Sequence, residues 1–241
     1  MRRSARLSRI LACAAVPVVL VAAGCSSDSD KDAKGTKDGA ASASSSDGSA
    51  KKESAPAVAP AKYTKLPVAC KVVAAKTVDE LVPKAASKSG TPGTSKDLMS
   101  RASCRWNGLV DKGVDGSQYR WLDVSLLRYD SDAALGSGEK RAQQNFAKEL
   151  SKAQATQGAK NVKTAPVAGL GSQASVVTYD LERGASFRYA TVVTRTENAV
   201  VTLSYNGAGY AGADSPKGSD VLADAQKAAK EAVAAVVAAN K

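Results

Sequence analysis

Residues 174–206 read ASVVTYDLERGASFRYATVVTRTENAVVTLSYN, and the fold class can be inferred mainly from this stretch. It contains three runs rich in β-branched and aromatic residues, at 174–181, 185–195 and 199–206. Only Thr196-Glu197-Asn198 separates the last two runs, and so short a link predicts a β-hairpin. Because strands joined by hairpins lie antiparallel, the stretch predicts three neighbouring antiparallel strands.

The chain around this stretch adds two strand patterns and three helix patterns. A capping box at residues 77–80 opens a short helix that Pro83 limits, and Ser137 is the predicted N-cap of a longer one. The order α-β-β-α-β-β-β-α predicts an α+β domain, in which helices pack on one face of a twisted antiparallel sheet of about five strands. The added elements are helices at 77–82, 137–153 and 220–239 and strands at 102–107 and 119–129.

The longer of these strands alternates between two kinds of side chain. Leu122, Val124 and Leu126 share one face, and the aromatic residues Trp121 and Tyr129 share the other. If the helices cover only the leucine face, an aromatic face stays open to an amphiphilic or anionic ligand. Ordinary cross-strand packing of aromatic residues is the alternative. The candidate binding face consists of Trp121, Arg128, Tyr129, Arg188 and Tyr189.

The first 24 residues have the pattern of an export signal. Four arginines precede an apolar segment, residues 10–23, that is too short to span a bilayer. Small residues then lead directly into Cys25, which resembles the lipobox of bacterial lipoproteins. The resemblance implies a diacylglycerol anchor on Cys25 and a place on the outer face of the cell membrane. A chance cysteine after an ordinary signal peptide is the alternative.

Residues 26–62 consist almost entirely of Ser, Ala, Asp, Lys, Gly and Pro. Such a composition buries too little apolar surface to offset the entropy of ordering, so residues 25–62 are expected to be a lipidated, disordered tether. Residues 63–241 remain, which is enough for a single domain.

The cysteines agree with export. Cys13 leaves with the signal and Cys25 takes the lipid, so Cys70 and Cys104 remain as a pair in an oxidising compartment. A redox or metal-binding pair would need a Cys-x-x-Cys spacing or further ligands, and the sequence has neither. A structural disulfide is therefore the prediction.

Composition excludes several functions. Histidine is absent, which excludes Ser-His-Asp and Cys-His nucleophile systems and every histidine metal site. The formal charge is +11, and residues 63–241 hold 24 basic and 17 acidic side chains, a net +7. That charge favours anionic neighbours in the envelope, but no basic cluster interleaved with aromatics indicates nucleic acid.

Two short motifs and one pair of acidic residues are weak evidence for cofactor binding or catalysis. Gly169-x-Gly171-x-x-Ala174 precedes a strand rather than a helix, so it does not predict a dinucleotide site, and we expect no cofactor. Ser137-x-x-Lys140 lacks the companion motifs of penicillin-interacting enzymes. Asp123 and Asp180 are the two acids on predicted strands that could form a catalytic carboxylate pair.

Three features carry a resemblance to a known family. Cys70 leads into the short helix that ends at Val82, Cys104-Arg105-Trp106 lies on a strand, and Gly169-Leu170-Gly171 precedes another. The domain is similar to a family of actinobacterial membrane-anchored lipoproteins of unknown function. It is also distantly similar to the extracytoplasmic sensor domains of mycobacterial Ser/Thr kinases. The resemblance implies a helix-backed antiparallel sheet, a Cys70–Cys104 bridge and a cleft for an unidentified ligand.

The function expected from the sequence is therefore non-enzymatic. We expect a lipid-anchored extracytoplasmic protein whose domain binds a ligand or an envelope protein. An accessory subunit of an envelope complex is the first alternative, and a wall-directed hydrolase is the second.

Overall fold

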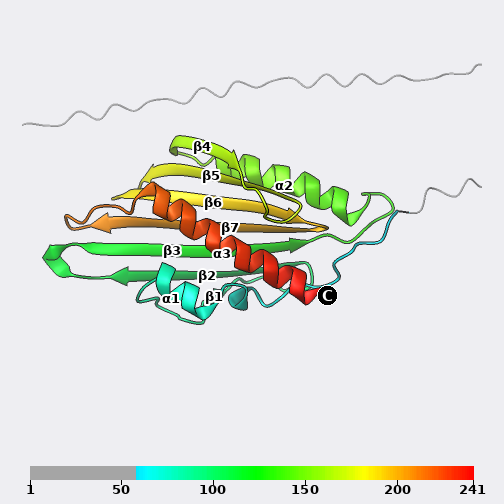
Figure 1. Cartoon of the computed structure of the whole chain (residues 1–241), viewed down its shortest axis with the longest axis horizontal. Helices are drawn as coiled ribbons and strands as arrows, with labels where there is room; N and C mark the ends of the chain where they lie inside the picture. Colours follow the sequence, from blue (N-terminus) through cyan, green and yellow to red (C-terminus); the bar gives the residue numbers. More distant parts are fainter. Residues whose placement is uncertain (1–57) are drawn as a thin grey trace, which may run out of the picture. The chain divides into compact units, whose positions relative to one another are not determined.

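A computed structural model describes residues 58–241 of the chain. The predicted signal peptide of residues 1–24, the lipidated Cys25 and most of the predicted tether lie outside the described residues. The described part forms one sheet with helices packed against it (Figure 1). In chain order its elements are η1 (Ala69–Lys71), α1 (Ala75–Leu81), β1 (Thr91–Pro92), β2 (Arg101–Val110), η2 (Gly113–Asp115), β3 (Ser117–Arg128), α2 (Gly138–Gln154), β4 (Lys160–Pro166), β5 (Gln173–Glu182), β6 (Ser186–Thr196), β7 (Ala199–Tyr210) and α3 (Gly218–Ala239).

The seven strands follow the order β1-β2-β3-β7-β6-β5-β4, and each pair of neighbours is antiparallel. The predicted antiparallel α+β class is confirmed, but the predicted number of about five strands is wrong. The additional strands, β1 and β4, form the two edges of the sheet. β1 has only two residues, and every residue of β4 is exposed, so neither shows the alternating apolar pattern that marks a half-buried strand.

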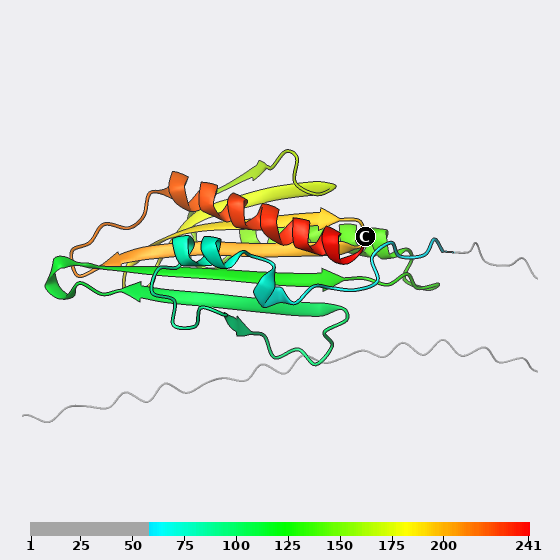
Figure 2. The same cartoon turned by 60° about the horizontal axis from the view of Figure 1, so that its bottom comes forward.

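α1 and α3 cover one face of the sheet (Figure 2). Beneath them Leu122, Val124 and Leu203 are completely buried. The Tyr205 hydroxyl, buried in the same layer, donates a hydrogen bond of 2.7 Å to the Leu81 carbonyl. Burial raises the pKa of Tyr205 to about 12, so this hydroxyl stays protonated and keeps the end of α1 on the sheet.

α2 packs on the opposite face, so the prediction that all helices lie on one face is wrong. Phe146 of α2 lies in a buried cluster with Val193 of β6 and Val200 of β7. Val192 and Val201, their chain neighbours, belong to the core on the other face. Adjacent buried valines place apolar side chains on both faces of a strand, and such a strand needs cover on both.

The predicted disulfide is present: Cys70 in η1 is bonded to Cys104 of β2. Gly90 lies against this bridge with φ +77°, and a Cβ at that position would collide with the Cys104 sulfur and the Trp106 ring. The bridge thus attaches the segment before α1 to β2, and the loop that crosses it needs glycine.

The hairpin turn between β6 and β7 holds the start of the described chain. The Asn198 side chain accepts a hydrogen bond of 2.7 Å from the Tyr63 amide and donates bonds of 2.9 and 2.8 Å to the Tyr63 and Tyr129 carbonyls. Lys62, the residue before Tyr63, forms an ion pair of 2.7 Å with Glu197. Asn198 therefore joins three separate chain segments.

Candidate ligand-binding groove

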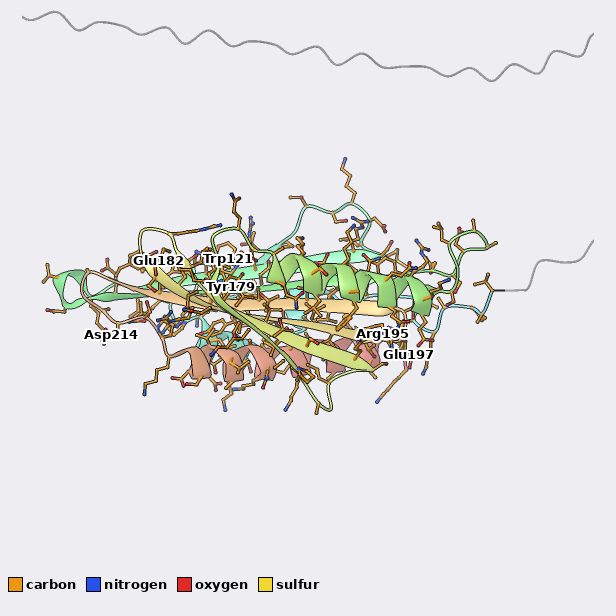
Figure 3. The ribbon with its side chains drawn as sticks, turned by 90° about the horizontal axis from the view of Figure 1, so that it is seen from above. Trp121, Tyr179, Glu182, Arg195, Glu197 and Asp214 are labelled. Carbon is orange, nitrogen blue, oxygen red and sulfur yellow. A yellow bond between two sulfur atoms is a disulfide. The ribbon has the colours of Figure 1, made fainter. Side chains whose placement is uncertain are left out.

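The face that α2 covers only in part carries a groove of about 540 Å³. α2 packs over the ends of β6 and β7 near their shared turn, and the groove lies farther along the same strands. In Figure 3, Trp121 lies on the side of the sheet that carries α2, beyond the end of that helix. The groove is lined by Tyr119, Trp121, Asp123, Arg183, Phe187, Tyr189, Ser204, Asn206 and Tyr210.

Strand register brings the central side chains together. Trp121 of β3 lies opposite Asn206 of β7, and Asn206 lies opposite Tyr189 of β6. Asp123 and Ser204 form the neighbouring row on β3 and β7. Because side chains alternate between faces, every second residue of these three strands contributes to the groove. Its floor is therefore rigid sheet.

The aromatic rings pack against one another along one side. Phe187 lies 6.0 Å from Tyr119 and 6.3 Å from Tyr210 between ring centroids, with interplanar angles of 76° and 80°. Tyr179 and Tyr189 stack in parallel at 4.8 Å. Such edge-to-face and stacked pairs fix the rings in place. Trp121 has no such ring partner among the described residues, and its side chain is half-buried.

Polar groups interrupt the aromatic floor. Asp123 is half-buried, and burial raises the pKa of its carboxyl above the ordinary value, against the opposing charge of Arg105 on β2. No ion pair joins Asp123 to an arginine or lysine among the described residues. Ser204 shares a hydrogen bond of 3.1 Å with Thr191. Asn206 is 5% exposed, and its side chain has no hydrogen-bond partner among the described residues.

Two of the five residues of the predicted binding face, Trp121 and Tyr189, line the groove. Tyr129 lies on the same face at the far end of β3, where it packs in the cluster under α2. The Arg141 guanidinium of α2 lies 5.7 Å from the centroid of its ring. Tyr129 is therefore part of the helix contact and lies outside the groove.

The two predicted arginines do not border the groove, and that expectation is wrong. Arg128 is 6% exposed, pairs with Asp130, and donates hydrogen bonds to the Met99 and Tyr63 carbonyls. Arg188 points to the opposite face, where it pairs with Asp180 at 2.6 Å. The strand alternation that turns Trp121 and Tyr189 into the groove turns Arg128 and Arg188 away from it.

The two strand acids also lie apart. Asp123 is in the groove, and Asp180 lines a hollow on the other face. Burial opposes ionisation of Asp180, but hydrogen bonds from Asn161 and Arg188 outweigh it and lower the pKa of that carboxyl. Asp123 and Asp180 therefore cannot act as a carboxylate pair on one substrate.

The binding face predicted from the sequence did not include Asn206 and Tyr210, which also line the groove. These two come from β7, which lies between β3 and β6 in the sheet. The alternation of β7 was visible in the sequence. Its place between β3 and β6 was not, so nothing in the sequence set Asn206 beside Trp121.

Residues 58–241 offer no helix with the length and apolar character needed to cross a bilayer. Within the same residues, no three potential metal ligands gather around a common point. Comparison with protein-family models, with curated proteins and with solved structures finds no match.

Proposed function

We propose that this chain is a membrane-anchored extracytoplasmic lipoprotein whose domain binds a ligand in the groove without changing it chemically. The N-terminal pattern supports the location, since an arginine-rich start and an apolar segment lead through small residues into Cys25. The resemblance to actinobacterial lipoproteins supports it as well. In this proposal a lipid on Cys25 keeps the domain at the outer face of the membrane.

The observation that carries the binding role is the open groove beyond α2. Binding sites for small ligands are concave, mostly apolar and contain a few polar groups that fix the orientation of the ligand. About 540 Å³ lies within the usual range of roughly 300–1,000 Å³ for such sites. Five aromatic side chains and the unpartnered groups of Asp123 and Asn206 meet this description.

The polar side chains that line the groove favour a binding function over hydrolysis. Asp123 is the one carboxyl group among the residues that line the groove, whereas glycoside hydrolysis generally uses two. Ser204 is the one serine or threonine that lines the groove. Its hydroxyl shares a hydrogen bond with Thr191 rather than with a general base. A non-catalytic site is the simplest reading of these contacts.

Trp121 emission in the full-length protein tests the proposal. The other tryptophan, Trp106, is 1% exposed in the core, so a ligand in the groove should change the emission of Trp121 alone. The titrants are a soluble digest of an actinobacterial cell wall and vesicles of its membrane lipids. The variant Trp121→Phe removes the reporter, and Val162→Ala, an exposed change on β4, is the matched control.

A ligand site predicts a saturable shift in the wild type and in Val162→Ala, and none in Trp121→Phe. Calorimetry with Trp121→Ala should then show weakened binding. If neither titrant produces a saturable change in the wild type, the groove is not the ligand site proposed here.

A second function, docking onto an envelope protein, is favoured by an apolar patch elsewhere. Val68, Leu98 and Met99 are 64%, 63% and 60% exposed, and Val68 and Leu98 line a shallow hollow near the disulfide. Exposed apolar side chains that cluster often mark protein contacts. If the patch docks, Leu98→Asp should abolish cross-links to envelope proteins in cells, and Val162→Asp should retain them. Unchanged cross-links in Leu98→Asp would exclude this function.

A further inference from the structure

The polar groups on the floor of the groove restrict the chemistry of its ligand. The Asp123 and Asn206 side chains have no hydrogen-bond partner among the described residues, and Asn206 as a whole is only 5% exposed. An alkyl chain laid over them would remove their remaining water and return no hydrogen bond, which is strongly unfavourable. A ligand that matches this floor has to be polar along the edge that faces it.

The kinds of group on the floor define that edge further. An ionised carboxylate only accepts hydrogen bonds, whereas an amide side chain both donates and accepts them. The ligand must therefore donate to Asp123 and exchange hydrogen bonds with Asn206. A polyproline segment has no backbone N–H and would present carbonyl oxygens to Asp123. An anionic group would meet the same carboxylate, which repels it, and among the residues that line the groove only the exposed Arg183 carries a positive charge.

The arrangement of the aromatic rings argues against a cationic ligand. A quaternary ammonium group is held when several ring faces surround one point. Here Phe187 presents to Tyr119 and Tyr210 at steep angles, and Tyr189 stacks on Tyr179, so the rings mainly contact one another. Arg105 and Arg183 also place positive charge beside the groove. Repulsion from these two guanidinium groups would oppose the attraction of Asp123 for a cation.

Trp121 is the one aromatic residue lining the groove that pairs with no other ring among the described residues, whether stacked or edge-to-face. It stands in the same row as Asn206 and next to the row of Asp123. A ligand seated here would contact a flat apolar surface on one side and hydrogen-bonding groups at its edge. Pyranose sugars have this character, because C–H groups cover a face of the ring and hydroxyl groups that donate and accept surround it.

We propose that the groove binds a neutral glycan, with a sugar ring stacked on Trp121 and its hydroxyl groups hydrogen-bonded to Asp123 and Asn206. This inference rests on the proposed function of the groove and names its ligand class. Tyr189 and Tyr210 extend the aromatic surface across β6 and the end of β7. The groove therefore offers room for more than one ring, and an oligosaccharide is the appropriate probe.

Calorimetry on the full-length protein tests this with tetrasaccharides of glucose, mannose and N-acetylglucosamine. We expect at least one of the three to bind. Trp121→Ala and Asp123→Asn should each weaken that binding on the order of 10-fold or more, as loss of a central contact does. Asn161→Ala is the matched control, because Asn161 bonds to Asp180 on the opposite face, and it should leave the affinity unchanged.

The results separate the glycan from the groove itself. If no tetrasaccharide binds but the wall digest or the lipid vesicles still shift Trp121 emission, the glycan inference is wrong and the groove remains a ligand site. If a proline-rich peptide binds and the sugars do not, the glycan inference is likewise wrong and the groove remains a ligand site. If sugars, peptide and envelope fractions all fail to bind, both proposals are overturned. Sugar binding that tolerates Trp121→Ala and Asp123→Asn would place the glycan elsewhere and contradict the inference.

Discussion

Trp121 on β3 lies directly opposite Asn206 on β7, and both side chains line the part of the sheet that α2 does not cover. A half-buried indole beside an unpartnered amide leaves both an apolar and a polar surface without a protein partner. This pairing is what distinguishes the groove from the packed half of the same sheet face, where Phe146 of α2 covers Val193 and Val200.

The two tryptophans should differ in what they do for stability. Trp106→Ala removes a ring that is 1% exposed and should lower the free energy of unfolding by about 3–5 kcal/mol. Trp121→Ala removes a half-buried ring and should cost about 1–2 kcal/mol. Urea unfolding followed by circular dichroism measures both without depending on tryptophan emission. Equal losses would mean that Trp121 is a packing residue and that the aromatic face is ordinary core.

Asp123→Asn should stabilise the fold at neutral pH. Burial raises the pKa of this carboxyl in the folded protein above its ordinary value of 3.8. The unfavourable burial of the charge is thus fully present above the folded pKa and disappears as the pH falls below the unfolded value. The stability difference between Asp123→Asn and wild type should shrink as urea unfolding is repeated from pH 7 to pH 3. A difference that does not change with pH would show that Asp123 is not penalised by burial.

The strands that form the core were predictable because the alternation of apolar and polar residues along each strand indicates which side chains are buried. The hairpin at Glu197 and Asn198 and the alternation around Leu122 depend on residues that are close together in the sequence. The Ser137 cap is of the same kind, since its hydroxyl accepts a hydrogen bond of 3.2 Å from the Lys140 amide. The disulfide followed from the number of cysteines that remain after Cys13 and Cys25 are assigned. Local chemistry decides these features, so the sequence is sufficient for them.

The features that were missed depend on contacts between distant segments. β4 is an exposed edge strand, held by its pairing with β5 rather than by an apolar pattern of its own. α2 packs on the sheet face opposite α3, against Val193 and Val200, which lie far from it in the sequence. The arginine error was different: Arg128 shares the parity of Leu126, so alternation alone already placed it on the face away from Trp121.

The bridge between Cys70 and Cys104 should be structural. Thiol labelling of the denatured, unreduced protein should leave both cysteines unmodified. Reduction should destabilise the domain by about 3–4 kcal/mol, as expected for opening a loop with a sequence separation of 34. Two reactive thiols in the protein isolated from cells would contradict the bridge and weaken the family resemblance.

Cys25 should determine where the protein is found. In cells, Cys25→Ala should shift the protein from the membrane fraction to the medium, or leave it unprocessed, because the sulfur that would carry the lipid is gone. Fractionation with antibody detection measures this, and Cys13→Ala is the matched control because Cys13 lies in the predicted signal. Undiminished membrane attachment of a processed Cys25→Ala protein would refute the lipid anchor.

Hydroxyl-radical footprinting of the full-length protein is the most direct test of ligand binding in the groove. Mass spectrometry reports oxidation of single side chains, with and without the wall digest. If the groove binds a ligand from the digest, Trp121, Tyr189 and Tyr210 should be protected and Tyr129, under α2, should be unchanged. Equal oxidation of all four residues with and without the digest, or protection of Tyr129 alone, would contradict a ligand site in the groove.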